Sequence, residues 1–190
     1  MELIDAIYRR RAVREFTSEP VGRDVIEKLI DAAIQAPSAM NLQPWSFAVV
    51  QDRAALLRIS AKAKAHLLKN IPPGSPLETL RGQLADPAFD IFYGAPALIV
   101  ICTAPYEGGE VAHGNEDCAL AAQNLMLAAF GSGLGTCWIG LSRPWLETVE
   151  GKAELDIPAQ HAPVAPIILG RPKALPPSHG RKKVEVFWHQ

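Results

Sequence analysis

Apolar residues near the N-terminus recur with the spacing of amphipathic helices. Leu3, Ile4 and Ile7 mark one helical face, and a second apolar stripe runs through residues 25–33 until Pro37 ends it. The two stripes predict a pair of helices on either side of an arginine-rich stretch.

Three later segments also predict helices. Asp52 is a suitable N-cap for the segment ALLRISAKAKAHLLK at 55–69. The segment EDCALAAQNLMLAAFGSG at 116–133 is apolar nearly all round, which indicates burial on two sides, by a second layer or by a second subunit. A further helix is expected within PWLETVEGKAEL at 144–155.

Short apolar runs lie between these helices and predict strands. They are WSFAVV at 45–50, APALIVICT at 95–103, TCWIG at 136–140 and VAPIILG at 164–170. The run at 95–103 is apolar throughout, which is typical of a central strand covered on both faces. The sequence thus predicts about four or five strands among about five helices, in an α+β or three-layer α/β domain.

The whole chain, residues 1–190, is expected to form one domain, because a chain of this length can bury about two-thirds of its unfolded surface. From about residue 171 the sequence is proline-rich and predicts an extended tail. This tail carries the basic cluster Arg181, Lys182 and Lys183.

Charge argues against two classes of partner. The chain has 19 lysine and arginine residues and 20 aspartate and glutamate residues, giving a formal net charge of −1. That balance, with no aromatic residues among the arginines, argues against binding to nucleic acid or to an anionic membrane surface. No apolar run reaches the roughly 18 residues of a membrane span, so we expect a soluble cytoplasmic protein.

The cysteines and histidines do not form a metal-ligating pattern. Cys102, Cys118 and Cys137 are far apart in apolar surroundings, which predicts buried free thiols in a reducing compartment. The five histidines show no paired spacing, so no metal site is expected. The glycines at 131–135 follow a helix and precede a strand, the reverse of the order in a dinucleotide-binding turn.

An unusual local feature is RRRAVREF at 9–16. Arg10 and Arg14 would share one face of a continuing helix turn, with Arg11 pointing elsewhere, and together they could grip a phosphate. The alternative is a solvated basic helix end, which the helix dipole favours at a C-terminus.

The segment APSAMNLQPWSFAVV at 36–50 places a stiff polar loop before a strand. Taken with RRAVREF at 10–16 and GLGTCWIG at 133–140, it resembles the nitroreductase family of flavin-dependent NAD(P)H oxidoreductases over nearly the whole chain. The resemblance implies a three-layer α/β/α fold with a mixed, mainly antiparallel central sheet and helices on both faces. It also implies a homodimer with two FMN sites at the interface.

The resemblance assigns several segments to FMN. The segment after the first helix and the basic tail would hold the phosphate, the polar loop would come from the other subunit, and the glycine-rich segment would lie along the isoalloxazine edge. The implied residues are Arg10, Arg11, Ala12 and Arg14; Pro37, Ser38, Ala39, Met40, Asn41 and Gln43; Ile139, Gly140 and Leu141; and Arg181 and Lys183. Family members often carry serine where this chain has Ala12, so one hydroxyl contact is missing here.

The implied activity is reduction of an electron-poor small molecule, such as a nitroaromatic or a quinone, by NADH or NADPH in a ping-pong reaction. Arg14 is the candidate cation near the N1–O2 edge of the flavin, and no side-chain nucleophile or acid–base residue is assigned. Segments 70–93 and 105–115 are the candidate lids, and their aromatic residues, Phe89, Phe92, Tyr93 and Tyr106, could cover a planar ring or pack in the core.

Two other functions remain open. The chain could bind or carry FMN without turnover by NAD(P)H. It could also be a specialised flavin enzyme of the same family, for example one that fragments flavin or removes a halogen reductively.

Overall fold

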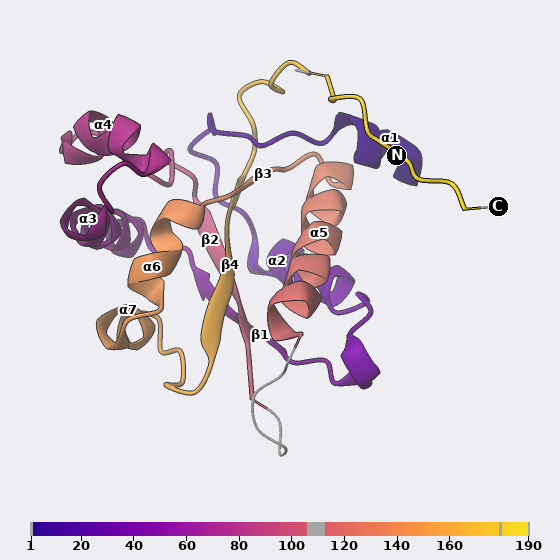
Figure 1. Cartoon of the computed structure of the whole chain (residues 1–190), viewed down its shortest axis with the longest axis horizontal. Coiled ribbons are helices and arrows are strands. Elements are labelled where there is room, and N and C mark those ends of the chain that lie inside the picture. Colours follow the sequence, from indigo (N-terminus) through magenta and orange to yellow (C-terminus); the bar gives the residue numbers. More distant parts are fainter. Residues whose placement is uncertain (1, 106–112, 179, 190) are drawn as a thin grey trace.

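A four-stranded antiparallel sheet forms the middle layer of the protein in the computed structural model, which describes residues 2–105, 113–178 and 180–189 (Figure 1). The strands are β1 (Trp45–Val50), β2 (Ala97–Thr103), β3 (Gly135–Trp138) and β4 (Ala162–Gly170), in the order β1-β2-β4-β3. All three ladders are antiparallel, and one isolated parallel bridge joins Ala12 to Thr136 of β3. The predicted mainly antiparallel sheet is confirmed.

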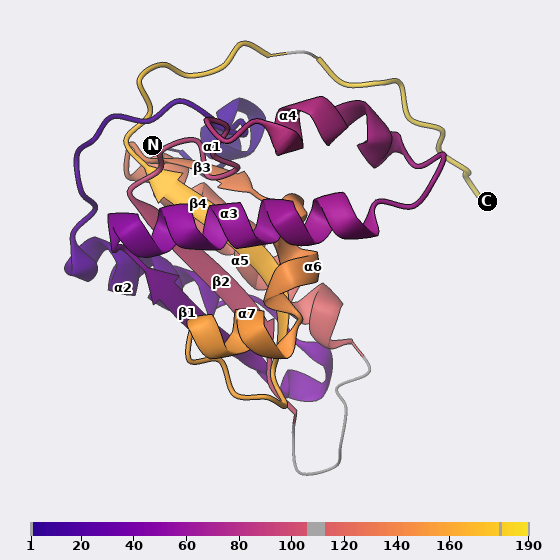
Figure 2. The ribbon, with the colours of Figure 1, turned by 90° about the vertical axis from the view of Figure 1, so that its left-hand side faces the viewer.

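Helices cover both faces of this sheet (Figures 1 and 2). On one face lie α1 (Leu3–Arg9), α2 (Arg23–Ala33) and α5 (Gly114–Gly131); on the other lie α3 (Arg53–Asn70), α4 (Arg81–Ala85), α6 (Arg143–Leu146) and α7 (Val149–Glu154). Short 3-10 turns occur at Ala39–Asn41, Pro76–Leu80 and Gly140–Ser142. No helix among the described residues is both long enough and apolar enough to cross a membrane.

The hydrophobic core has two halves because side chains of β2 alternate between the faces of the sheet. Leu98, Val100 and Cys102 join the half under α3, whereas Ala97, Ile99 and Ile101 join the half under α5, and all six are buried. The prediction of a central strand covered on both faces is therefore confirmed.

Helix α5 packs against the sheet and also against α2, which lies beside it on the same face of the sheet (Figures 1 and 2). Ala121, Ala122 and Leu125 are fully buried, but Leu120 on the remaining side is 46 % exposed. Packing within one chain therefore buries most of the apolar residues of α5. The exposed stripe around Leu120 is not covered by the described residues of this chain.

The segment predicted as one helix at 144–155 is two short helices, so that prediction is wrong. Thr148 separates α6 from α7: its hydroxyl donates to the Trp145 carbonyl at 2.7 Å and accepts from the Gly151 amide at 3.0 Å. Thr148 is therefore the N-cap of α7. A side chain at Gly151 would also lie 2.1 Å from the Trp145 carbonyl oxygen, so glycine is needed for this close approach.

All three cysteines are free and buried, as the sequence predicts. Desolvation is the main cause that raises the pKa of Cys102 and of Cys118 to about 12.

These two thiols predict a loss of stability at alkaline pH. They stay protonated in the folded chain while the unfolded chain ionises them from about pH 9, so the unfolded state binds fewer protons. Between pH 8 and pH 10, each thiol should lower the free energy of unfolding by about 1.4 kcal/mol. Urea unfolding of the wild type and of Cys118→Ala at both pH values checks this. An equally steep loss in the variant contradicts a contribution from Cys118.

Candidate functional site

The arginine-rich segment leaves the helix earlier than the sequence suggests. Helix α1 ends at Arg9, and Arg10 has φ −56° and ψ 133°, which is an extended backbone conformation. The Val13 amide donates to the Thr136 carbonyl at 2.9 Å, so the segment continues along β3. The expectation that Arg10 and Arg14 share a helix turn is wrong.

The guanidinium groups of Arg10 and Arg14 nevertheless both lie near the Cys137 thiol. In an extended segment alternate side chains share a side. Both guanidinium groups lie close enough to the Cys137 thiol to lower its pKa, although burial raises that pKa more strongly.

Close packing fixes this segment against the sheet. Val13 is buried, and a side chain at Gly135 would meet its Cβ and methyl groups at 2.7–2.9 Å. Glycine at the start of β3 thus lets the arginine segment approach the strand directly.

The start of the C-terminal tail comes close to the residues that follow α1. The Arg11 guanidinium donates to the Ser178 hydroxyl at 2.7 Å, and also to the carbonyls of Tyr8 and Arg10 at 2.7 and 2.8 Å. Burial lowers the pKa of Arg10, and the neighbouring charges of Arg11 and Arg181 lower it further. Arg10, Arg11 and Arg181 therefore form one cationic cluster, joined from two distant parts of the chain.

This cluster has no acidic partner within the part of the chain that the structure describes. None of the ion pairs there involves Arg10, Arg11, Arg14 or Arg181. The Arg11 Nε atom is buried without a hydrogen-bond partner among the described residues. Lys183, the other predicted basic residue, is exposed and makes no hydrogen bond or ion pair in those residues. Uncompensated guanidinium groups of this kind fit a dianionic phosphate.

The glycine-rich segment provides an open backbone surface. β3 ends at Trp138 instead of residue 140, and Ile139 is buried with its amide donating to the Pro166 carbonyl at 2.8 Å. Gly140 is exposed at the start of a 3-10 turn, and a side chain built on it would meet nothing within 4 Å. The amides that open such a turn have no acceptor inside it, so a planar ligand can approach this backbone and accept a hydrogen bond.

The polar loop at 37–43 is rigid and strained. The Ser38 hydroxyl accepts from the Gln43 backbone amide at 2.9 Å, and the Gln43 side chain donates to the side-chain Oδ1 of Asn41 at 3.0 Å. Met40, Asn41 and Gln43 all have positive φ, at 52°, 57° and 50°. Such conformations cost free energy and occur often at ligand-binding sites. Met40 is 90 % exposed at the tip of the loop.

Asp117 supports this loop, a contact that was not predicted from the sequence. It lies in the first turn of α5, is only 3 % exposed, and its Oδ1 accepts from the Ala39 amide at 3.0 Å. Its Oδ2 is buried without a partner among the described residues. A carboxylate near the start of an otherwise apolar helix is the signal that could have identified it.

The structure divides the predicted residues between two ends of α5 (Figure 1). The loop at 37–43 contacts the first turn of α5, whereas the arginine segment pairs with β3, which follows the last turn. The helix has 18 residues and is therefore about 27 Å long. One chain thus contains two separate candidate half-sites: the cationic cluster beside β3, and the polar loop at 37–43.

The predicted lid residues have different positions. Phe92 is fully buried in the core and covers no site. Tyr93 is half-buried, with the Arg14 guanidinium carbon 5.9 Å from its ring centre, and Phe89 meets Tyr93 edge-on at 5.8 Å. The other candidate lid lies mostly outside the described residues, and Tyr106 with it.

Comparison with known proteins gives a consistent result. The model of the nitroreductase family matches residues 7–171. A Methanothermobacter thermautotrophicus protein provisionally named NADH dehydrogenase/NAD(P)H nitroreductase is 31 % identical over 93 % of this chain and 80 % of its own length. The 5,6-dimethylbenzimidazole synthase of Rhodospirillum rubrum is 32 % identical over 90 % and 82 %. The crystal structure of a Desulfitobacterium hafniense nitroreductase with bound FMN superposes with a TM-score of 0.82 over the full length of both chains, at 25 % identity.

Proposed function

Because the chain belongs to the nitroreductase family, we propose that it is an FMN-dependent oxidoreductase. In this proposal NADH or NADPH reduces the enzyme, and a small electron-poor molecule such as a nitroaromatic or a quinone then reoxidises it in a ping-pong cycle. The observation that carries the proposal is the cluster of Arg10, Arg11 and Arg181, which lacks an acidic partner in the described chain.

The two half-sites assign roles to the predicted residues. Arg10, Arg11 and Arg181 would hold the phosphate, and Lys183 would join them if the tail closes over the ligand. Residues 139–141 would lie along the ring edge, with the backbone around Gly140 offering a hydrogen bond. Ala12 lies between the arginines and offers no hydroxyl, so the contact there is limited to its backbone.

A second copy of the chain would bring the half-sites together. A two-fold axis that crosses the α5 helices antiparallel would bring the 37–43 loop of one protomer beside the arginines of the other. Leu3, Ile4 and Tyr8 on α1 are 64 %, 61 % and 73 % exposed, as expected of a surface that a partner covers. The loop residues Pro37, Ser38, Ala39, Met40, Asn41 and Gln43 would thus serve the partner's cofactor.

When bound, FMN takes hydride from NAD(P)H and returns electrons to the acceptor. The protein contributes position and charge. Arg14, held over the Tyr93 ring, would stabilise negative charge at the pyrimidine edge of the flavin. No side chain is assigned as an acid or base, and solvent can supply the acceptor's proton. Buried free thiols accord with a reducing compartment such as the cytoplasm.

Replacing Arg14 by glutamine should lower the reduction potential of the bound flavin by tens of millivolts, because a positive charge that favours the reduced form is lost. Anaerobic equilibration with a reference dye measures this potential. Arg23→Gln, which removes a surface arginine paired with Glu27, is the matched control. An unchanged potential in Arg14→Gln removes Arg14 from this role.

The proposed function is tested by the absorbance spectrum of the purified protein. We expect a flavin band that bleaches anaerobically with NADH or NADPH and returns when a quinone or a nitroaromatic is added. A band that never bleaches indicates a protein that binds or carries FMN without turnover. Absence of the band even after FMN is added contradicts the cofactor assignment.

One comparison favours a second candidate, fragmentation of the flavin itself, since the relative from R. rubrum is named 5,6-dimethylbenzimidazole synthase. Incubating the reduced protein with FMN and oxygen, followed by chromatography, distinguishes the two candidates. Recovery of dimethylbenzimidazole supports the second, and recovery of intact FMN supports the first.

A further inference from the structure

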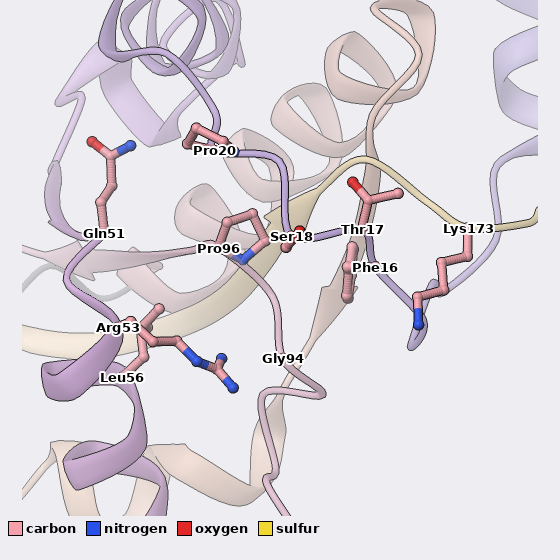
Figure 3. A pocket seen from close by; sticks show the side chains of 10 residues that line it. All are labelled: Phe16, Thr17, Ser18, Pro20, Gln51, Arg53, Leu56, Gly94, Pro96 and Lys173. Atoms are coloured by element: carbon pink, nitrogen blue, oxygen red, sulfur yellow. The ribbon is translucent and has the colours of Figure 1, made fainter.

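A separate cavity lies beyond the arginine segment, at the start of α3 (Figure 3). Its volume is about 600 Å³, within the range of small-molecule sites. The walls come from the segment after Glu15, the start of α3, the turn before β2 and the chain after β4. None of the residues assigned above to FMN lines it.

Two basic side chains reach this cavity from different walls. Arg53 is the first residue of α3, and Lys173 follows β4; Figure 3 shows them on either side of the Gly94 turn. Each of them offers a positive charge to an anionic group of a ligand in the cavity.

Neither charge is well compensated within the described residues. The nearest acid to Arg53 is Asp90, and the Arg53 Nη1 to Asp90 Oδ2 distance is 3.7 Å. Asp90 already accepts from the amides of Phe92 and Gly94 at 2.9 and 3.0 Å. Lys173 makes no side-chain hydrogen bond or ion pair there. Lys173 is therefore available to a ligand, and Arg53 has only a long ion pair with a carboxylate that other donors also use.

The rest of the lining combines apolar and polar surface. Phe16, Leu56 and Pro96 provide carbon atoms, and the Ser18 hydroxyl lies near them (Figure 3). Phe16 and Pro96 are so close to Gly170 that a side chain there would meet them at 2.9 and 2.6 Å. This wall is thus tightly packed behind its apolar surface.

Hydrogen bonds fix the segments that form the walls of the cavity. The Thr17 amide donates to the Arg171 carbonyl at 2.9 Å, and the Lys173 amide donates to the Glu15 carbonyl at 3.0 Å. The Gln51 side chain donates to the Val21 carbonyl at 2.7 Å. The site is therefore formed before a ligand binds, so little free energy is lost in ordering it on binding.

We propose that this cavity binds a small organic anion. Its carboxylate or phosphate group lies between Arg53 and Lys173, and its apolar body lies against Phe16, Leu56 and Pro96. None of the residues assigned to FMN lines the cavity, so the proposed ligand would bind while FMN is bound.

Calorimetric titration of the purified protein in excess FMN tests this proposal. Phenyl phosphate and benzoate represent the two anionic groups, and we expect at least one to bind with a dissociation constant of about 1 mM or below. The better of the two identifies the preferred head group. Inorganic phosphate and benzyl alcohol, which lack the apolar body or the charge, should each bind at least tenfold more weakly.

Variants connect the binding to this cavity. Lys173→Gln should weaken binding of the better probe at least tenfold, and Arg53→Gln with Lys173→Gln should abolish it, whereas Arg23→Gln should have no effect. Because Lys173 makes no other side-chain polar contact in the described chain, its loss should not disturb the fold. Failure of both probes to bind, equally strong binding of inorganic phosphate, or unchanged binding in the double variant would each overturn the proposal. The flavin absorbance, recorded in parallel, reports separately on the cofactor site.

Discussion

Replacing Arg10 and Arg11 together by glutamine is expected to weaken FMN binding by roughly 10² to 10⁴-fold. Each hydrogen bond between a charged donor and a phosphate is worth about 1.5–3 kcal/mol, and the variant loses two such donors. The dissociation constant follows from FMN fluorescence, which is measured during equilibrium titration of the apoprotein. Arg9→Gln is the matched control, because Arg9 is exposed on the last turn of α1, next to the cluster.

The single variant Arg10→Gln separates a loss of binding from a loss of folding. The Arg10 side chain makes no hydrogen bond or ion pair in the described residues, and burial, followed by the charges of Arg11 and Arg181, lowers its pKa. Removing its charge should therefore leave the melting temperature of the apoprotein equal or slightly higher while FMN affinity falls. A lower melting temperature with unchanged FMN affinity would show that Arg10 is structural and belongs to no phosphate site.

Local sequence pattern was sufficient to predict the four strands and the burial of the central one, whereas the mainly antiparallel sheet was implied by the family resemblance. The apolar run at 95–103 contains β2 because the residues from Ala97 to Cys102 meet a covering layer on both faces, as the continuous apolar sequence indicates. Asp52 likewise caps α3 through a local contact, accepting from the Ala55 amide at 2.6 Å.

The arginine segment could not be predicted in this way. Arginine is a good helix former, so nothing local ends α1 at Arg9. The extended conformation results from pairing with Thr136 and from packing of Val13 against Gly135, which are contacts between residues far apart in the sequence. The identity of the site residues came from the family resemblance, whereas their conformation came from tertiary contacts.

The conformation of the loop at 37–43 could not be predicted from local sequence either. Its polar residues are visible in the sequence, but three positive φ angles and the contact with Asp117 are not. The distance between this loop and the arginines follows only from where α5 lies in the fold. That separation is the strongest structural reason to expect two chains in each site.

A heterodimer of two differently substituted chains should therefore contain one intact FMN site and one defective site. One chain carries Arg10→Gln and Arg11→Gln, and the other carries Ser38→Ala, Asn41→Ala and Gln43→Ala. Each homodimer should retain little FMN, because every site in it lacks one half. In the heterodimer, purified through two different tags, the intact arginines of one chain face the intact loop of the other. We expect one FMN per heterodimer, measured by absorbance after removal of free flavin.

A second heterodimer makes the result decisive, since it contains the same substitutions in a different arrangement. Here one chain carries all five substitutions and its partner is wild type. If each site combines arginines from one chain with the loop of the other, both sites are defective and no FMN is retained. If each chain builds its own site, the wild-type chain retains one FMN and the first heterodimer retains none. The two arrangements therefore give opposite FMN occupancies. A dimer of two wild-type chains, purified through the same two tags, is the reference and should retain two FMN molecules. Occupancy that follows the wild-type chain would contradict the shared site, and with it the proposed role of the 37–43 loop.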